Sequence, residues 1–196
     1  MRCFVAVDVP EATRDAIAAA QGRLREAGPR ADVGWVDARK LHLTLKFLGE
    51  VPEPTVDVIR DALAVIARRH EPFALAAGGM GGFPSRARPR VLWAGLTDGL
   101  REIGLLAADV ERACVPLGFP MDSRPFRGHA TIGRVRSPRG ISRVLAAMEG
   151  LERESFGAWT VREIILYRSH LRGSAGSVYE PLARLVLGSA SAGEDG

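Results

Sequence analysis

Two short segments of this chain alternate apolar residues with a histidine and a threonine, and this alternation restricts the fold more than any other feature of the sequence. The segments are LHLTLKFLG and, later in the chain, RGHATIGR. Successive side chains of an extended strand point to opposite faces. His42 and Thr44 therefore share one face of the first strand, and His129 and Thr131 share one face of the second. Each segment is predicted to be a strand with an apolar face in the core and a polar face at a site.

The rest of the 196-residue chain predicts strands and helices in mixed order. Apolar residues recur at helical spacing in four segments, and short apolar runs bounded by turn residues read as strands. We expect strands at residues 2–8, 35–36, 41–47, 73–83, 90–96, 129–134, 160–169 and 179–187, and helices at residues 10–27, 56–70, 98–117 and 141–148.

The order of these elements predicts an α+β fold. No long linker divides the chain, and strands and helices recur in similar order in each half, with one His-x-Thr strand per half. Two related lobes around a shared cleft would explain this recurrence. We expect residues 1–187 to form a single bilobal domain and residues 188–196 to form a disordered tail.

Composition and charge restrict the class of protein. No segment approaches the roughly 18 apolar residues needed to cross a bilayer, and the apolar run near the N-terminus is too short for a signal-peptide core. Cys3 and Cys114 have neither CxxC spacing nor a disulfide-rich pattern, which predicts reduced, buried thiols in a cytoplasmic protein. A net charge of +4 suits an anionic substrate but falls short of a protein that coats nucleic acid. We expect a monomer with no membrane partner.

The paired histidines and threonines carry the chemistry. A lone histidine in a strand is usually structural, but two of the four histidines have threonine two residues later. The unperturbed imidazole pKa of about 6.5 allows one ring to be neutral and the other protonated near neutral pH. One ring can then accept a proton from an attacking water or hydroxyl while the other protonates the departing oxygen, and the hydroxyls can bind a phosphate. The remaining histidines, His70 and His170, are expected to be structural or exposed.

Metal-dependent chemistry is the rival use of paired histidines. Zinc requires further His, Cys or carboxylate ligands, and magnesium requires clustered carboxylates, yet neither motif contains Asp or Glu. The chain has no GxxxxGK[ST] loop, and its segment GGMGGFP does not precede a helix as a dinucleotide site requires. The sequence therefore predicts chemistry without a metal or a cofactor.

These motifs resemble those of the 2H phosphoesterase family, named for two H-x-[ST]-x motifs, and within it the RNA 2′,3′-cyclic phosphodiesterases once described as 2′-5′ RNA ligases. Besides HLTL and HATI, the segments RCFVAVDVP, LKFLGEVPE, FPSRARPRVLWAGL, LYRSHL and YEPL are similar to that subfamily, so the resemblance extends over nearly the whole chain. It departs at Gly128, where such proteins commonly have proline. The resemblance implies a bilobal α+β fold with pseudo-two-fold symmetry, in which antiparallel sheets line a central cleft, one motif strand comes from each lobe, and helices lie outside.

The resemblance also implies a role for each motif residue. His42 would be the general acid that protonates the leaving 3′ oxygen, and His129 would be the general base that activates water, so that a 2′,3′-cyclic phosphate opens to a 2′-phosphomonoester. Thr44 and Thr131 would bind the phosphate. Attack by an RNA 5′-hydroxyl would give ATP-independent 2′-5′ ligation. The expected partner is RNA with 2′,3′-cyclic phosphate ends or a related nucleotide.

The sequence leaves open the roles of two basic residues and the choice between the main function and two alternatives. Lys46 shares strand parity with His42 and is a candidate phosphate contact. Arg134 matches a basic residue that the family often places after the second motif, but strict alternation turns it away from His129 unless a bulge near Gly133 re-aims it. The alternative functions are a phosphodiesterase acting on small cyclic nucleotides, ADP-ribose cyclic phosphate or 2′-5′ oligoadenylate, and a non-catalytic RNA- or nucleotide-binding module.

Overall fold

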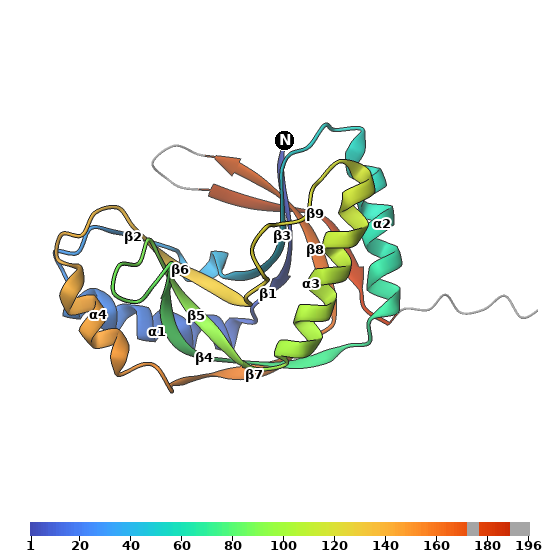
Figure 1. The fold of residues 1–196 in the computed structure, drawn as a ribbon. Coiled ribbons are helices and arrows are strands. Elements are labelled where there is room, and N and C mark those ends of the chain that lie inside the picture. Colours follow the sequence, from blue (N-terminus) through green and yellow to red (C-terminus); the bar gives the residue numbers. More distant parts are fainter. Residues whose placement is uncertain (172–176, 189–196) are drawn as a thin grey trace, which may run out of the picture.

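The computed structural model describes residues 1–171 and 177–188, which form one antiparallel sheet of nine strands flanked by helices (Figure 1). The predicted disordered tail, apart from Gly188, lies outside these described residues. The strands are β1 (Arg2–Asp8), β2 (Val33–Trp35), β3 (His42–Glu50), β4 (Phe73–Phe83), β5 (Val91–Asp98), β6 (His129–Val135), β7 (Ser155–Val161), β8 (Glu163–Leu171) and β9 (Ser177–Val186). The helices are α1 (Glu11–Ala27), α2 (Thr55–Arg69), α3 (Leu100–Cys114) and α4 (Ile141–Glu149), with short 3₁₀ helices at Ala38–Lys40 and Val115–Leu117.

The two motif strands lie side by side in the middle of the sheet. The strand order is β7-β4-β5-β6-β3-β1-β8-β9, with the short β2 beside β6. The first motif is on β3 and the second on β6, and these strands are in register at Leu43 and Ala130. Both of these side chains are buried in the main hydrophobic core. Apart from β2, the sheet therefore has two halves of four strands, which join at the motifs.

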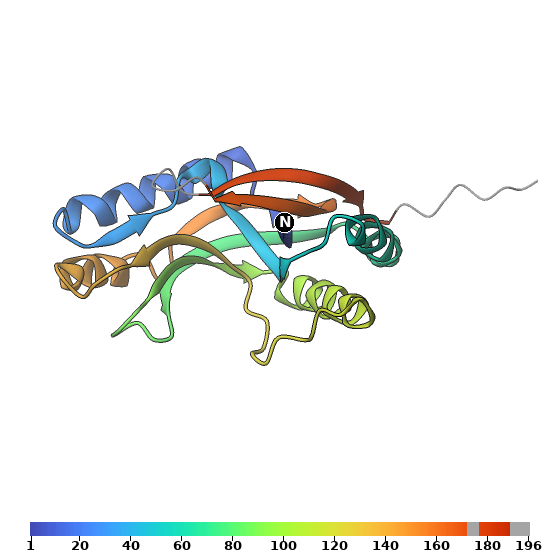
Figure 2. The same ribbon diagram turned by 90° about the horizontal axis from the view of Figure 1, so that it is seen from above.

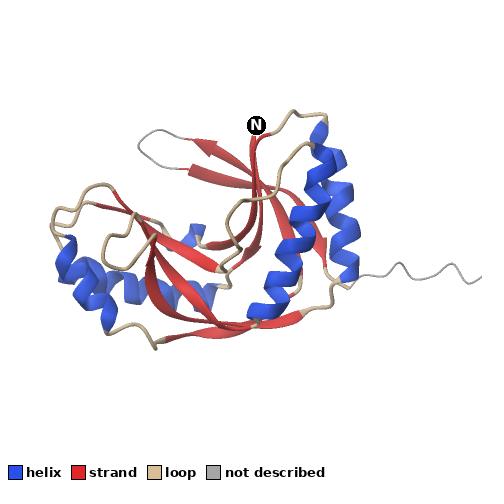
Figure 3. Cartoon of the chain, viewed as in Figure 1, coloured by secondary structure: helices blue, strands red, loops and turns tan. Residues whose placement is uncertain are grey.

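Each half of the sheet is covered by its own pair of helices. α2 and α3 pack against each other and against β3, β8 and β9, whereas α1 and α4 pack against each other and against β7 and β4. From above, the two helix pairs lie at opposite ends of the molecule (Figure 2). Figure 3, which has the orientation of Figure 1, shows the strands between the two helix pairs. We call β1, β3, β8, β9, α2 and α3 the His42 lobe, and β2, β4, β5, β6, β7, α1 and α4 the His129 lobe.

The lobes do not coincide with the two halves of the sequence. α1 and β4 precede β5 in the chain but belong to the His129 lobe, and α3, β8 and β9 follow β5 but belong to the His42 lobe. Each lobe therefore needs segments from both halves of the chain to complete its packing. The predicted α+β class is confirmed, and each of the two lobes is built from segments of both halves of the chain.

One predicted strand is two strands in the structure. The sequence predicts a single extended run at residues 160–169, but β7 ends at Val161 and pairs with β4, whereas β8 begins at Glu163 and pairs with β1 in the other lobe. Arg162 lies between them, and its carbonyl oxygen accepts a hydrogen bond from the backbone N–H of Leu187. No glycine or proline marks this change of partner, so the local sequence signals for a turn are missing.

A buried glutamine connects α1 to the motif strand β6. Nε2 of Gln21 donates hydrogen bonds to the backbone carbonyl oxygens of Val36 and Ile132, each at 2.8 Å. The backbone N–H of Val36 also donates to the Ile132 carbonyl oxygen, at 2.9 Å. The regular pairing of β6 with β5 is interrupted at Ile132. Gln21 therefore supports the sheet where its backbone is irregular.

Replacing Gln21 with methionine is expected to lower the free energy of unfolding by about 1–3 kcal/mol, because it removes two buried hydrogen bonds while keeping a side chain of similar volume. Chemical denaturation followed by circular dichroism measures this loss. Ala19→Met, at an exposed position of the same helix, is the control, and its effect is expected to stay within about 0.5 kcal/mol. An equal effect of the two substitutions would contradict the role of the Gln21 amide.

Candidate active site

The pairing of β3 with β6 brings both motifs onto one face of the sheet. Leu43 and Ala130, which lie between the histidine and the threonine of each motif, are opposite each other and point into the core. Extending this register by one residue places His42 opposite Thr131 on the other face, and it places Thr44 opposite His129. The histidines are then diagonal neighbours, a relation in which residues are about 7–8 Å apart. Two imidazoles and two hydroxyls therefore surround one small area of the sheet surface.

Backbone carbonyl groups orient both imidazole rings in the same way. Nδ1 of His42 lies 2.7 Å from the carbonyl oxygen of Lys40, and Nδ1 of His129 lies 2.6 Å from that of Arg127. A carbonyl oxygen can only accept a hydrogen bond, so each Nδ1 carries a hydrogen and donates it. Nε2 of each ring is then the nitrogen that can exchange a proton with a ligand.

Burial makes both imidazoles easier to deprotonate than a histidine in water. It lowers the pKa of His42, although the hydrogen bond to the backbone and the negative charge of Asp8 oppose this effect. Burial also lowers the pKa of His129, where the backbone hydrogen bond opposes it and the positive charge of Arg134 reinforces it. The Asp8 carboxylate thus favours the protonated form of His42, and the Arg134 guanidinium disfavours the protonated form of His129.

Aromatic side chains pack around His42. The ring centroid of His42 lies 4.9 Å from that of Phe4 and 5.1 Å from that of Tyr179, which it meets edge-on. Phe4 in turn stacks on Tyr167, with centroids 5.2 Å apart. These contacts restrict rotation of the His42 ring and account for much of its burial.

A β-bulge after the second motif brings Arg134 to the cleft. The register of β6 with β5 shifts between Thr131 and Gly133, which leaves Ile132 as an extra residue on β6. The extra residue reverses the alternation that would otherwise turn Arg134 away from His129. Arg134 is exposed and lines the same cavity as Thr131. The bulge that the sequence required for this placement is therefore present.

A corresponding bulge after the first motif turns Lys46 out of the cleft, whereas strand alternation alone would place it beside the phosphate. Leu45 is the extra residue on β3 in its pairing with β1. Nζ of Lys46 lies 2.7 Å from Oε2 of Glu111 on α3 and 2.9 Å from the carbonyl oxygen of Pro120. The Lys46 side chain is 2% exposed and that of Glu111 is 13% exposed. Lys46 is therefore a structural partner that joins the strand to the helix.

A cavity of about 350 Å³ opens on the motif face. His42 and both motif threonines line it, whereas His129 does not. Phe47 and Tyr179, which no sequence motif marks, also line the cavity. Phe47 is 64% exposed. It follows its motif histidine by five residues, as Arg134 does in the other strand, and the bulges bring both to the cleft. The remaining lining residues are Arg2, Cys3, Phe4, Val36, Lys40, Gly49, Ser169 and Ser177.

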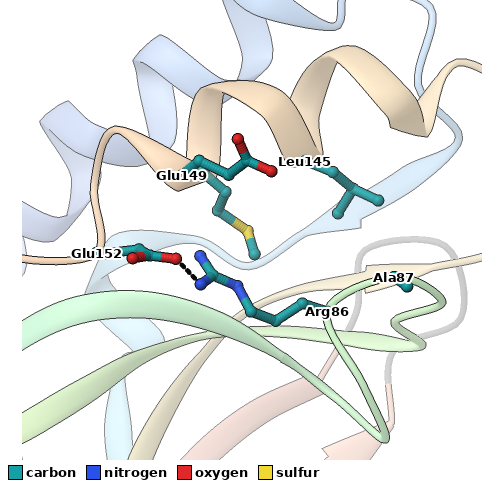
Figure 4. Close-up of a pocket in the computed structure, with 6 residues that line it drawn as sticks. Arg86, Ala87, Leu145, Glu149 and Glu152 are labelled. Carbon is teal, nitrogen blue, oxygen red and sulfur yellow. Dashed lines mark ion pairs between the residues drawn. The ribbon is translucent and has the colours of Figure 1, made fainter.

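A second cavity, of about 470 Å³, shares no lining residue with the first. It lies between α4 and the loop that follows β4 (Figure 4). Arg86 forms an ion pair with Glu152 there, and Leu145, Met148 and Glu149 also line the cavity. None of the residues predicted for the site lies in it.

The other two histidines contact carboxylates outside the motifs. Nε2 of His70, at the end of α2, lies 2.7 Å from Oδ2 of Asp109 on α3. Nε2 of His170 lies 2.6 Å from Oε2 of Glu180 across the β8–β9 pair. Both residues are structural or exposed, as the sequence predicts.

The predicted thiols are free and buried at Cys3 and Cys114. Within residues 1–171 and 177–188, no group of three or more His, Cys, Asp or Glu side chains is placed to hold a metal ion. In the same part of the chain, no helix has both the length and the apolar composition needed to span a membrane.

Comparison with known proteins identifies the family. A family model described as LigT like phosphoesterase matches residues 7–93 and 96–177, and each matched stretch contains one His-x-Thr motif. The chain belongs to the LigT-like phosphoesterase family. The resemblance to 2H phosphoesterases that the two motifs indicate is thereby confirmed.

Relatives in this family match nearly all of the chain. An RNA 2′,3′-cyclic phosphodiesterase of Geobacillus stearothermophilus is 33% identical over 193 residues, which are 98% of this chain and 59% of that protein. A protein of the same name from Methanothermobacter thermautotrophicus is 33% identical over 179 residues, which are 91% of this chain and 95% of that protein. The chain thus spans little more than half of the first relative and nearly all of the second.

Solved structures of the family share the fold. The structure of the Thermus thermophilus protein TT0787 has a TM-score of 0.80 and 31% sequence identity, with 96% of this chain and 98% of that chain covered. E. coli LigT complexed with 3′-AMP has a TM-score of 0.70 and 29% identity, with coverages of 95% and 97%. The fold of this chain is therefore shared by both of these proteins.

Lys46→Met is expected to lower the free energy of unfolding by about 3–5 kcal/mol, because it leaves the Glu111 carboxylate buried without its partner. The double variant Lys46→Met, Glu111→Leu is expected to recover most of this loss, since it removes both charges. Urea denaturation measures both effects. The double variant is also expected to keep the KM of the wild-type protein for a phosphodiester substrate. A strongly raised KM in this stable double variant would show instead that Lys46 contacts the substrate.

Proposed function

We propose that this protein hydrolyses RNA 2′,3′-cyclic phosphate ends to 2′-phosphomonoesters by metal-independent acid–base catalysis with two histidines. The observation that carries the proposal is the register of β3 with β6, which sets two imidazoles and two hydroxyls around one point on the sheet surface. The names of the Geobacillus and Methanothermobacter relatives support the choice of substrate.

The phosphate is held by the two motif threonines and by Arg134. The hydroxyls of Thr44 and Thr131 donate hydrogen bonds to its non-bridging oxygens. The guanidinium of Arg134, which lines the same cavity, neutralises part of the charge on these oxygens. These groups stabilise the phosphate most strongly in the transition state, when its negative charge increases.

The proton transfers follow from the charges around each ring. Neutral His129 donates from Nδ1 to the Arg127 carbonyl and accepts a proton from water at Nε2. The water oxygen attacks phosphorus, and the bond from phosphorus to O3′ breaks. Protonated His42 gives the proton on Nε2 to O3′, which leaves a 3′-hydroxyl and a 2′-phosphate. Asp8 favours the cation at His42 and Arg134 disfavours it at His129, which supports this direction.

The aromatic wall of the cavity suits a nucleobase. Phe47 and Tyr179 line the cavity on the side of the His42 lobe, and the Phe47 ring is largely exposed. Stacking of a base on an aromatic side chain tolerates any base. The proposed substrate is therefore the cyclic phosphate end of RNA without a strict sequence preference. An RNA 5′-hydroxyl in place of water would lead to a 2′-5′ linkage without ATP.

A second candidate substrate is a small nucleotide with a cyclic phosphate. The structure of E. coli LigT with 3′-AMP favours it, because that family member binds a mononucleotide. Competition between RNA ends and a nucleoside 2′,3′-cyclic phosphate would rank the two substrates.

The buried free thiols of Cys3 and Cys114 support a reducing compartment, and we place the activity in the cytoplasm.

Replacing either His42 or His129 with alanine is expected to lower kcat by at least about 10²-fold on RNA with a cyclic phosphate end, since each ring transfers a proton. The wild-type protein is expected to stay active in EDTA and to release a 2′-phosphate, identified by product analysis. His70→Ala, which removes an imidazole outside the motifs, is the control and is expected to stay active. Full activity of either folded motif variant in EDTA would refute the mechanism.

The pH dependence of kcat/KM is expected to be bell-shaped, with an optimum on the acidic side of the ordinary histidine pKa of about 6.5. The rate falls at low pH as the base, His129, becomes protonated, and at high pH as the acid, His42, loses its proton. Burial lowers the pKa of both rings, so both limbs move toward acid. Initial rates in overlapping buffers provide the test, and a rate that rises steadily into alkaline pH would contradict it.

A further inference from the structure

Asp8 lies directly opposite His42 in the β1–β3 ladder. It is the last residue of β1, and His42 is its register partner. Directly opposite residues of an antiparallel pair have Cβ atoms about 4.5–5.5 Å apart on the same face of the sheet. Phe4 and Ala6, at alternate positions before Asp8, belong to the small apolar cluster beside the His42 ring. The Asp8 carboxylate is therefore on the imidazole side of the sheet.

The Asp8 carboxylate is held in place by Tyr167 of β8. The Tyr167 phenol donates a hydrogen bond to Oδ1 of Asp8 at 2.7 Å, and its ring stacks on Phe4. Arg184 reaches Oδ2 of Asp8 only at 3.9 Å and has a closer partner in Glu163. The carboxylate thus has a fixed position, and Arg184, which also pairs with Glu163, neutralises its charge only in part.

The equivalent position beside His129 carries no charge. His129 pairs with Gly95 of β5, as His42 pairs with Asp8 of β1. A Cβ atom at Gly95 would lie 3.0 Å from the Trp93 ring, which leaves little room for any side chain. The packing of the His129 lobe therefore disfavours a carboxylate there. The pseudo-symmetry of the two motifs is broken at this pair of positions.

We infer that Asp8, fixed by Tyr167, is a positioning residue that favours the protonated form of His42 over that of His129 and thereby makes His42 the acid of the pair. This inference rests on the proposed two-histidine function and gives a physical reason for the unequal roles of two similar motifs. Asp8 does not touch the reacting atoms and acts on them through the imidazole. Its negative charge raises the pKa of His42, against the larger lowering by burial.

The other charged and titratable groups around His42 do not favour its cation. His129 lies close enough for its positive form to disfavour a second charge. Lys40 and Arg134, which line the same cavity, are cationic. Tyr179 stays neutral, because burial raises the pKa of its phenol. Around this ring, the carboxylate of Asp8 is thus the charge that stabilises the imidazolium.

Asp8→Asn tests the inference, because the amide keeps the shape of the side chain and an acceptor for Tyr167 but removes the charge. The Asp8 side chain is 40% exposed, so the variant is expected to fold. NMR titration of isotope-labelled histidine is expected to show a lowered pKa for His42 and little change for His129. The alkaline limb of the kcat profile is expected to move toward acid, with kcat near neutral pH reduced about three- to tenfold.

Two matched variants separate charge from structure. Asp8→Glu keeps the charge and is expected to leave the titration of His42 close to that of the wild-type protein. Glu50→Gln removes the same charge at the other end of the β1–β3 ladder, opposite Arg2, and is also expected to leave it unchanged. An unchanged His42 titration in Asp8→Asn, or an equal shift in Glu50→Gln, would overturn the inference.

The titration also distinguishes this inference from the proposed function, because it does not depend on turnover. If the wild-type protein hydrolysed no cyclic phosphate while Asp8→Asn still shifted His42, the proposed function would fail and the coupling of Asp8 to His42 would stand. If the wild-type protein hydrolysed the substrate and Asp8→Asn changed neither the titration nor the pH profile, the inference would fail and the function would stand.

Discussion

The pairing of Leu43 with Ala130 is the contact on which the candidate site depends. It joins the two lobes at the centre of the sheet, and both side chains are buried in the core that the lobes share. A slip of one residue in either strand would turn its histidine and threonine into the core and its apolar residues toward the cleft. The free energy of burying the apolar face therefore holds the register, and the register holds the imidazoles and hydroxyls together.

Two β-bulges decide which side chains reach the cleft beyond the motifs. Simple alternation would bring Lys46 to the cleft and turn Arg134 away, and the extra residues Leu45 and Ile132 reverse both placements. Lys46 then forms an ion pair with Glu111 of α3, while Arg134 and the exposed ring of Phe47 line the cavity. The cavity has a cation beside one motif and an aromatic ring beside the other, which suits a phosphate attached to a nucleoside.

The two motifs have similar backbones but unequal surroundings. Each ring is partly buried and donates a hydrogen bond from Nδ1 to a backbone carbonyl, but the charges beside the two rings differ. Asp8 stands beside His42, whereas Gly95 stands beside His129 and Arg134 adds a positive charge there. The charge of Asp8 is partly screened by water, so its influence is moderate. The two charges act in opposite directions, because Asp8 raises the pKa of His42 and Arg134 lowers that of His129.

The sequence by itself determined the two His-x-Thr strands, most of the helices and strands, the α+β class and the choice of His42 and His129 as candidate catalytic residues. These follow from local periods of two and 3.6 residues, which are visible in any short window. Only the tertiary structure decided the two β-bulges, which turn Lys46 away from the cleft and Arg134 toward it. It also decided the change of strand partner at Arg162 and the hydrogen bond between Tyr167 and Asp8. Asp8 and Tyr167 are 159 residues apart in the chain. Such contacts depend on how distant segments pack, and no local pattern of residues records them.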